Sequence, residues 1–366
     1  MQKKHNFGAG PCILPQEVLR TASQAVLNWD GTGLSILEIS HRSEGFKTVM
    51  DTTRQLIREL LKVPDSYEIL FLQGGASTQF SMIPLNFLEI WRPGVFLDTG
   101  FFSRKAIKEA EHFGEVTVVA SSQDKDYSYI PDDYEIPAES SFFHCTSNNT
   151  IEGTQMNHFP DSPVPLFCDM SSDIFSRYIN VRDFDLIYAG AQKNMGPAGL
   201  TLVIVKNELL GPLGANKPAM WDYRTYREHK SLYNTAPVFS IYVTMLNLMW
   251  LKGKGIEDIW QQNIAKAKAL YQEIDRNSLF YGFAHPPHRS MMNVTFKMHD
   301  TSIEAAFLAY AEEKGMVGIS GFPTMGGFRV SLYNALRLSS VMELIHCMQA
   351  FENIQLKNIQ ATTANS

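Results

Sequence analysis

Short apolar runs alternate with amphipathic stretches along the first two-thirds of the chain. The runs have the length and composition of buried strands, and the stretches between them repeat apolar residues with helical spacing. Such alternation predicts an α/β fold with a mostly parallel sheet covered by helices. The predicted strands are Ile69–Leu72, Val95–Asp98, Val116–Ala120, Phe142–Cys145, Leu166–Cys168, Leu186–Ala189 and Leu200–Val205.

A second, smaller α+β domain is predicted after Gly253 and Gly255. Here long amphipathic stretches dominate, and apolar strands are few. We expect a large domain over residues 16–254 and a small domain made of residues 255–366 and 1–15. The predicted helices are Gln16–Asn28, Phe46–Leu61, a stretch ending at Leu88, Ser103–Phe113, Ser240–Leu251, Ile256–Arg276, Ser302–Lys314 and Ser339–Phe351. The predicted strands of the small domain are Met292–Met298 and Phe328–Leu332, and residues 211–238 read as irregular.

Chemically capable residues follow the predicted parallel strands. Ligands of such sheets bind beyond the carboxyl ends of the strands, so these residues should converge there. They are Ser77, Thr78, Phe102, Thr150, Asp169 and Lys193.

Lys193 lies between two apolar runs in the segment Asp185–Val205. Glycine and alanine surround it, so a flat ligand could approach the backbone closely. A buried lysine has a lowered pKa and can act as an amine nucleophile that forms a Schiff base. The alternative is an ordinary surface lysine in a loop, which is how most lysines occur.

Two further features strengthen the first interpretation. Asp169 emerges from an apolar strand, where a carboxylate needs a partner, and the protonated ring nitrogen of pyridoxal phosphate is such a partner. The alternative is that Asp169 caps the following turn. Residues 74–78, GGAST, join a strand to a helix N-terminus and could bind an anion; the alternative is a tight turn with Ser77 or Thr78 as the helix cap.

Length and charge narrow the function classes. The chain has 366 residues, which favours two domains, and its formal net charge of −6 gives no electrostatic reason to expect nucleic acid or an anionic membrane as a partner. Neither a signal peptide nor an apolar span of membrane length is evident, so we expect a cytoplasmic protein. The four cysteines lack metal-ligand and CxxC spacing, which predicts reduced thiols and no metal site.

Seven stretches together resemble the phosphoserine aminotransferase family, fold-type-I enzymes that use pyridoxal phosphate. They are NFGAGP near the start, EISHR at Glu38–Arg42, GGAST, NNTIEG at Asn148–Gly153, DMSSDIFSR, AQKN and FRVSLYNAL. The resemblance covers essentially the whole chain. It implies a homodimer of two-domain subunits, with the active site at the dimer interface and glutamate with 2-oxoglutarate as one substrate couple.

The resemblance also implies roles for individual residues. Lys193 would form the Schiff base with the cofactor, and Asp169 would pair with its ring nitrogen. The other cofactor contacts would be Ala76, Ser77, Phe102, Thr150 and Gln192, with Asn234 and Thr235 supplied by the partner subunit. The substrate contacts would be Arg329 for the α-carboxylate and His41 with Arg42 for the distal anion.

The chain departs from the family pattern just before the arginine strand. The family usually places a histidine and an arginine where this chain has Phe322 and Pro323, and some members have an arginine at the position of Ser77. A related aminotransferase acting on a non-phosphorylated amino acid is therefore the alternative function, unless Arg104 or His285 replaces the missing pair. A rival from another class is a non-catalytic ligand-binding α/β protein.

Overall fold

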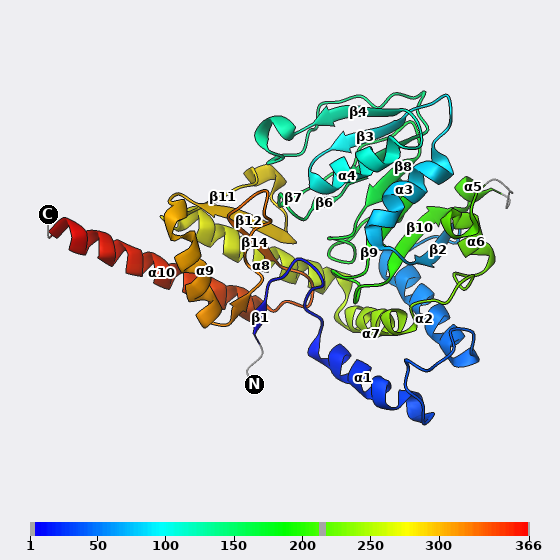
Figure 1. Ribbon diagram of the computed structural model, residues 1–366, viewed down its shortest axis with the longest axis horizontal. Helices are drawn as coiled ribbons and strands as arrows, with labels where there is room; N and C mark the ends of the chain where they lie inside the picture. The colour runs from blue at the N-terminus through cyan, green and yellow to red at the C-terminus, as the bar shows by residue number, and fades with distance from the viewer. Residues whose placement is uncertain (1–3, 212–216, 365–366) are drawn as a thin grey trace.

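The computed structural model describes residues 4–211 and 217–364, and a mixed sheet forms its centre (Figure 1). Within the described residues this sheet has seven strands in the order β2-β10-β9-β8-β5-β3-β4. Strand β10 runs antiparallel to both neighbours, and the remaining pairs are parallel, which confirms the predicted architecture. The strands are β2 Tyr67–Leu72, β3 Gly94–Asp98, β4 Val116–Ser121, β5 Phe142–Thr146, β8 Leu166–Asp169, β9 Leu186–Gly190 and β10 Thr201–Lys206.

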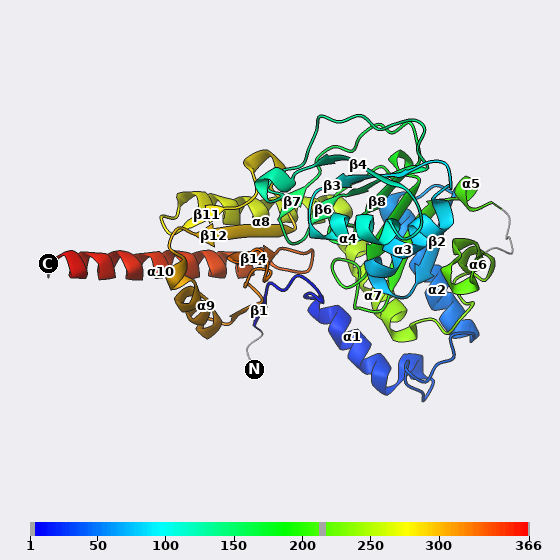
Figure 2. The ribbon, with the colours of Figure 1, turned by 45° about the horizontal axis from the view of Figure 1, so that its top comes forward.

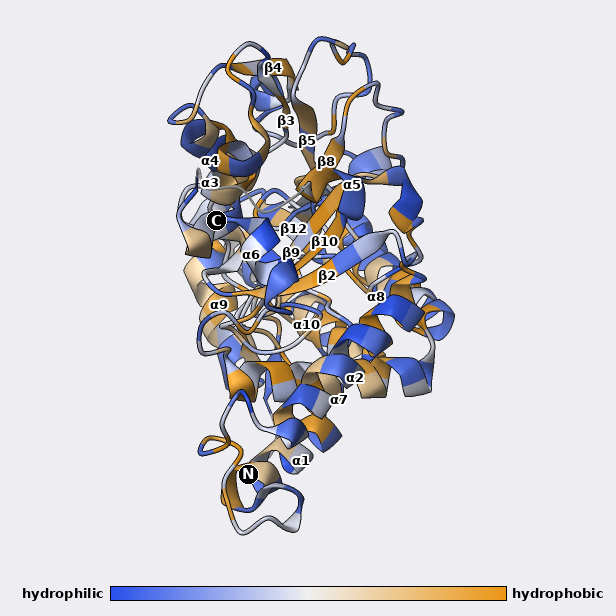
Figure 3. Cartoon of the chain, turned by 90° about the vertical axis from the view of Figure 1, so that its right-hand side faces the viewer, coloured by the Kyte–Doolittle hydropathy of each residue, from blue (hydrophilic) through white to orange (hydrophobic). Residues whose placement is uncertain are grey.

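Helices cover both faces of the sheet because apolar residues point both ways from its strands. Along β10, Leu202 and Ile204 pack toward α1, α2 and α7, whereas Val203 and Val205 pack toward α3, α4 and α6. Figure 3 shows the strands coloured mostly as hydrophobic, while α2 alternates between both colours. These helices are α1 Gln16–Leu27, α2 Glu44–Leu61, α3 Gly75–Phe87, α4 Phe101–Ala110, α6 Tyr223–Glu228 and α7 Val238–Lys254.

The C-terminal third forms a separate hydrophobic core around an antiparallel sheet of β11, β12 and β14 (Figure 2). The N-terminal strand β1 joins this part of the molecule by pairing with β13. Gly255, with φ of +85°, breaks the chain between α7 and α8 where the glycines predicted a boundary. The elements are β1 His5–Asn6, α8 Ile256–Arg276, β11 Phe280–Gly282, β12 Asn293–Met298, α9 Glu304–Glu313, β13 Met316–Val317, β14 Phe328–Ser331 and α10 Leu338–Ala364.

Two sequence predictions were wrong in extent. The final helix does not end at Phe351 but continues to Ala364 and projects from the molecule (Figure 1). Beyond Phe351 the helix carries exposed apolar residues, Ile354 and Leu356, so no buried stripe predicted its continuation. The segment predicted as irregular contains α6, whose N-cap Asp222 accepts a hydrogen bond from the Arg224 amide. None of the helices in the described ranges combines the length and apolarity that crossing a bilayer requires.

Candidate active site

Lys193 lies in the turn after β9 and is buried, with 9% of its surface exposed. Its Nζ donates a hydrogen bond of 2.6 Å to Thr150 Oγ1 and lies 5.5 Å from the centroid of the Phe102 ring. Burial disfavours the charged ammonium and lowers the pKa of Lys193 to about 8. The structure therefore contradicts the surface-lysine alternative and provides an amine that is partly unprotonated near neutral pH.

Close packing fixes the turn that carries Lys193. A Cβ on Gly196 would lie 2.3 Å from Thr244 Oγ1, so a side chain does not fit there. From α7, Asn247 donates hydrogen bonds of 2.9 Å to the carbonyl groups of Asn194 and Met195. Helix α7 thus fixes the backbone of the turn that carries Lys193.

The N-terminal segment covers the same turn, a contact that sequence reasoning missed. Cys12 Sγ donates to the carbonyl oxygen of Lys193 at 2.6 Å, and the Cys12 amide donates to the carbonyl of Gln192 at 3.1 Å. Burial raises the pKa of the Cys12 thiol to about 12, so this thiol stays protonated. The small residues in NFGAGP were a signal for this close approach, since a Cβ on Gly10 would lie 3.4 Å from Lys193 Cγ and 3.5 Å from Gln192 Cγ.

Asp169 ends β8 and is 5% exposed. Burial raises the pKa of its carboxyl group, while the Ser171 donors and the charge of Lys193 oppose that rise. The Ser171 amide donates to Asp169 Oδ1 at 2.8 Å, so the capping role that we had considered as an alternative is present as well. A buried carboxylate and a buried amine therefore lie close enough at the strand ends for each charge to shift the pKa of the other.

The N-terminus of α3 offers unsatisfied backbone donors. Its N-cap is Gly74, with φ of +95°, and no side chain caps the helix. The alternative of a Ser77 or Thr78 cap is wrong, because the Thr78 hydroxyl donates instead to the Gly74 carbonyl at 3.0 Å. The free N–H groups at Gly75, Ala76 and Ser77 and the helix dipole favour an anion at this position.

Asn234 and Thr235 lie next to this helix start within the same chain. Asn234 Nδ2 donates to Gln73 Oε1 at 2.8 Å, and Gln73 Nε2 donates to the carbonyl of Thr235 at 3.1 Å. His41 lines a surface pocket together with Thr235, and Arg42 is exposed before α2. Within the described chain, neither His41 nor Arg42 forms a hydrogen bond, ion pair or ring contact with Arg329.

Arg329 projects from β14, and the Phe322 ring lies 6.0 Å from its Cζ atom. Phe322 in turn packs against Phe101, with ring centroids 5.2 Å apart. Phe101 packs edge-on against Phe102 at 5.3 Å, so three aromatic rings connect the arginine to the lysine pocket. The two residues considered as replacements for the missing basic pair make contacts with tyrosines. Arg104, on α4, interacts with Tyr127, and His285 stacks on Tyr129.

Glu152 is a second buried acid near the site that sequence reasoning missed. It is 2% exposed, and its Oε1 accepts a hydrogen bond of 2.7 Å from the Phe101 amide at the start of α4. Burial raises the pKa of Glu152 to about 7, and the charge of Arg329 opposes that rise. This contact holds the turn that presents Phe102 to Lys193.

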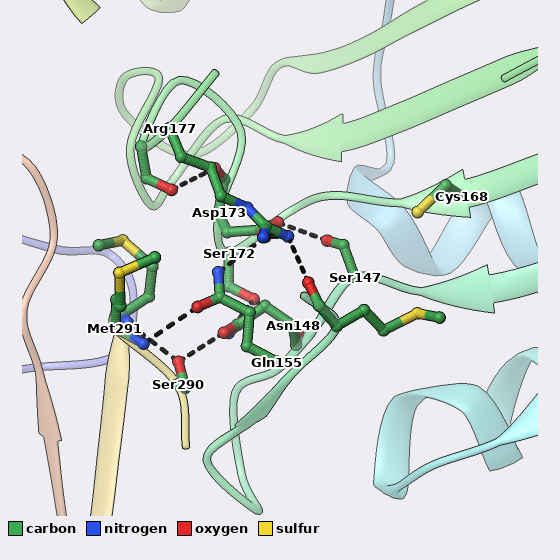
Figure 4. A network of polar contacts seen from close by, with 12 residues as sticks. Ser147, Asn148, Gln155, Cys168, Ser172, Asp173, Arg177, Ser290 and Met291 are labelled. Atoms are coloured by element: carbon green, nitrogen blue, oxygen red, sulfur yellow. Dashed lines mark hydrogen bonds and ion pairs between the residues drawn. The ribbon is translucent and has the colours of Figure 1, made fainter. Parts of the chain in front are cut away.

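A buried polar network joins the C-terminal third of the chain to the central sheet (Figure 4). Asn148 Nδ2 donates to Ser172 Oγ at 2.9 Å and to Asn293 Oδ1 at 2.8 Å. Alongside it, Asp173 pairs with Arg177 at 3.2 Å. The loop that carries Thr150 is thereby tied both to the segment after Asp169 and to β12, which pairs with the strand of Arg329.

Comparison with known proteins identifies the family. The model of the class-V aminotransferases matches residues 5–344. The chain belongs to the class-V aminotransferase family. Among similar class-V aminotransferases, the phosphoserine aminotransferase of Flavobacterium psychrophilum is 52% identical, and the match covers 96% of this chain and 99% of that protein. The corresponding protein of Bacteroides thetaiotaomicron is 51% identical, with 96% and 99% covered. A solved phosphoserine aminotransferase from Bacillus circulans subsp. alkalophilus superposes with a TM-score of 0.95 at 40% identity, covering 97% of this chain and all of that one.

The lowered pKa of Lys193 predicts a distinct reactivity. In competitive labelling of the cofactor-free protein with a trace amine acylating reagent, Lys193 should reach half its maximal reactivity near pH 8. Exposed Lys268, on α8, is labelled in the same experiment as the internal control for the reagent. A Lys193 midpoint in the ordinary lysine range, about 10.4, would contradict the burial argument.

Proposed function

We propose that this chain is a phosphoserine aminotransferase that moves the amino group of glutamate to 3-phosphohydroxypyruvate. The observation that carries the proposal is the buried amine of Lys193 between Thr150, Phe102 and Asp169 at the strand ends. The near-complete coverage of relatives named phosphoserine aminotransferase supports this substrate assignment.

The pocket fits pyridoxal phosphate at three separate points. Lys193 would hold its carbonyl carbon, Asp169 its protonated ring nitrogen, and the free amides of Ala76 and Ser77 its phosphate. Phe102 would cover the ring face, and Gln192 and Thr150 would contact its substituents. When bound, the cofactor supplies an electron sink for charge that develops at the substrate Cα.

The chain's own groups supply the remaining chemistry. With a pKa of about 8, the Lys193 amine can take a proton from the substrate Cα and return it on the other side of the transfer. Arg329 would bind the α-carboxylate as a bidentate partner, since no acid in the described chain forms an ion pair with it. Asp169 would hold the ring nitrogen protonated, and the Ser171 donors and the charge of Lys193 favour the ionised form of its carboxyl group.

We infer that the protein is a cytoplasmic homodimer. Each subunit would consist of a large domain, residues 16–254, and a small domain, residues 255–366 with 1–15. His41 and Arg42 would lie near the distal anion of the substrate, and Asn234 and Thr235 of the partner subunit would reach the cofactor phosphate. Within one chain, Asn234 and Thr235 contact Gln73 just before the start of α3, which supports a place beside the cofactor phosphate.

The activity test uses purified protein supplied with pyridoxal phosphate. We expect a yellow protein that forms 2-oxoglutarate from glutamate and 3-phosphohydroxypyruvate. Lys193→Ala should lose this activity by several orders of magnitude, whereas Lys268→Ala, on the exposed face of α8, should keep it. A colourless wild type without transaminase activity toward any amino acid would instead favour the non-catalytic binder.

Subunit sharing can be tested by mixing two inactive variants. If Asn234 and Thr235 act across the interface, Lys193→Ala chains combined with Asn234→Ala/Thr235→Ala chains form heterodimers with one intact site. We expect activity to return after subunit exchange. If the pair acts within its own chain, as its contact with Gln73 also permits, no heterodimer contains an intact site and activity stays absent.

Phe322 and Pro323 predict weakened selectivity for the phosphorylated substrate. Neither side chain can donate a hydrogen bond, and each charge-assisted bond to a phosphate that is lost costs about 1.5–3 kcal/mol, roughly ten- to a hundredfold in kcat/KM. We expect Phe322→His/Pro323→Arg to raise the preference for phosphoserine over serine and alanine. A wild-type preference above about four decades that this double substitution leaves unchanged would show that other groups hold the phosphate.

A further inference from the structure

His144 is a buried histidine that the proposed reaction does not use. It lies on β5, is 1% exposed, and places its Nε2 atom 3.0 Å from the hydroxyl of Tyr188 on β9. The two rings stack with centroids 5.9 Å apart. Burial lowers the pKa of His144 to about 3, so the imidazole is neutral at physiological pH.

The partners available to the two ring nitrogens of His144 decide which group donates in its hydrogen bond with Tyr188. A neutral imidazole carries one N–H group, and His144 Nδ1 has no partner in the described chain. A proton on Nδ1 would leave a buried donor unsatisfied, so the proton belongs on Nε2, which donates to the Tyr188 oxygen. The Tyr188 hydroxyl is then free to donate its own proton to another acceptor.

The carboxylate beside Tyr188 in the sheet register is that of Asp169. The two residues are register partners on the adjacent strands β8 and β9, and each group shifts the pKa of the other. Since β8 lies between β5 and β9, the three side chains come from three neighbouring strands of the central sheet. We call His144, Tyr188 and Asp169 the row. Because its members lie on strands, their positions are more precise than those of loop residues would be.

We propose that His144 and Tyr188 are positioning residues that keep the Asp169 carboxylate ionised and oriented toward the ring nitrogen of the cofactor. The inference rests on the proposed function, because it assumes pyridoxal phosphate in this pocket. In this row, His144 Nε2–H donates to the Tyr188 oxygen and Tyr188 O–H donates to Asp169. The row acts on the substrate through Asp169 alone.

The groups that face Asp169 decide whether loss of the Tyr188 hydroxyl raises or lowers the pKa of its carboxyl group. Burial raises the pKa of its carboxyl group, whereas the Ser171 donors, the Lys193 charge and the Tyr188 hydroxyl lower it. The thiol of Cys168, beside Asp169 on β8, stays neutral because burial raises its pKa as well. Removing the Tyr188 hydroxyl therefore raises the pKa of Asp169, and its charge is lost at a higher pH than in the wild type.

The test compares Tyr188→Phe with a matched control, Tyr223→Phe. Tyr223 is equally buried in the same hydrophobic cluster, but its hydroxyl donates to Gln79 Oε1 at 2.6 Å instead of to the site. Each cofactor-free protein is titrated with pyridoxal phosphate across the pH range. We expect Tyr188→Phe to bind about tenfold more weakly, with the acidic limb of the binding curve moved to higher pH, and Tyr223→Phe to stay within about twofold of wild type.

A second comparison tests the order of the row. His144→Phe should weaken binding in the same direction, and His144→Phe/Tyr188→Phe should be no weaker than Tyr188→Phe alone, because both act through one hydroxyl. Wild-type binding by Tyr188→Phe at every pH, or equal losses in Tyr188→Phe and Tyr223→Phe, would overturn the proposal. A wild type that binds no cofactor would reject the proposed function itself, so the two failures are distinguishable.

Discussion

The cost of burying the Lys193 amine constrains the rest of this structure. An ammonium group without water loses its hydration, and the chain compensates with one hydroxyl, one carboxylate and an aromatic face instead of a full ion pair. The result is a pKa of about 8, which leaves a fraction of the amine free near neutral pH. The packed glycine turn and the donors around Asp169 both serve to keep that environment in place.

The C-terminal third of the chain takes part in the same arrangement. The side chain of Asn194, next to Lys193, accepts a hydrogen bond of 3.0 Å from the Asn334 amide just past β14. Asn263 on α8 donates to Asn334 Oδ1 at 2.9 Å and to the carbonyl of Ser176 at 2.9 Å. These buried asparagines fix Arg329 relative to Lys193, so the positions of a substrate carboxylate and of the reacting amine are set by one connected network.

The sequence predicted the site residues that directly follow a strand. Asp169 and Lys193 follow apolar strands directly, and the ends of parallel strands meet, so their proximity could be inferred. Glu152 and Cys12 could not be placed, because their contacts join segments far apart in the chain; Cys12 and Lys193 are 181 residues apart. The extent of α10 was missed for a different reason, since an exposed helix lacks the buried stripe on which the prediction relied.

The central claim is that Lys193, a buried amine at the strand ends beside Asp169, is the reactive amine. Reduction of the cofactor-loaded protein with borohydride, followed by peptide mapping, tests this most directly. Lys266 is the sharpest competitor, because it is also buried and its pKa is lowered to about 7, but its Nζ donates to the carbonyls of Leu332 and Tyr333 away from the strand ends. The account predicts the cofactor label on Lys193 alone. A label on Lys266 or another lysine, with Lys193 unmodified, would contradict it.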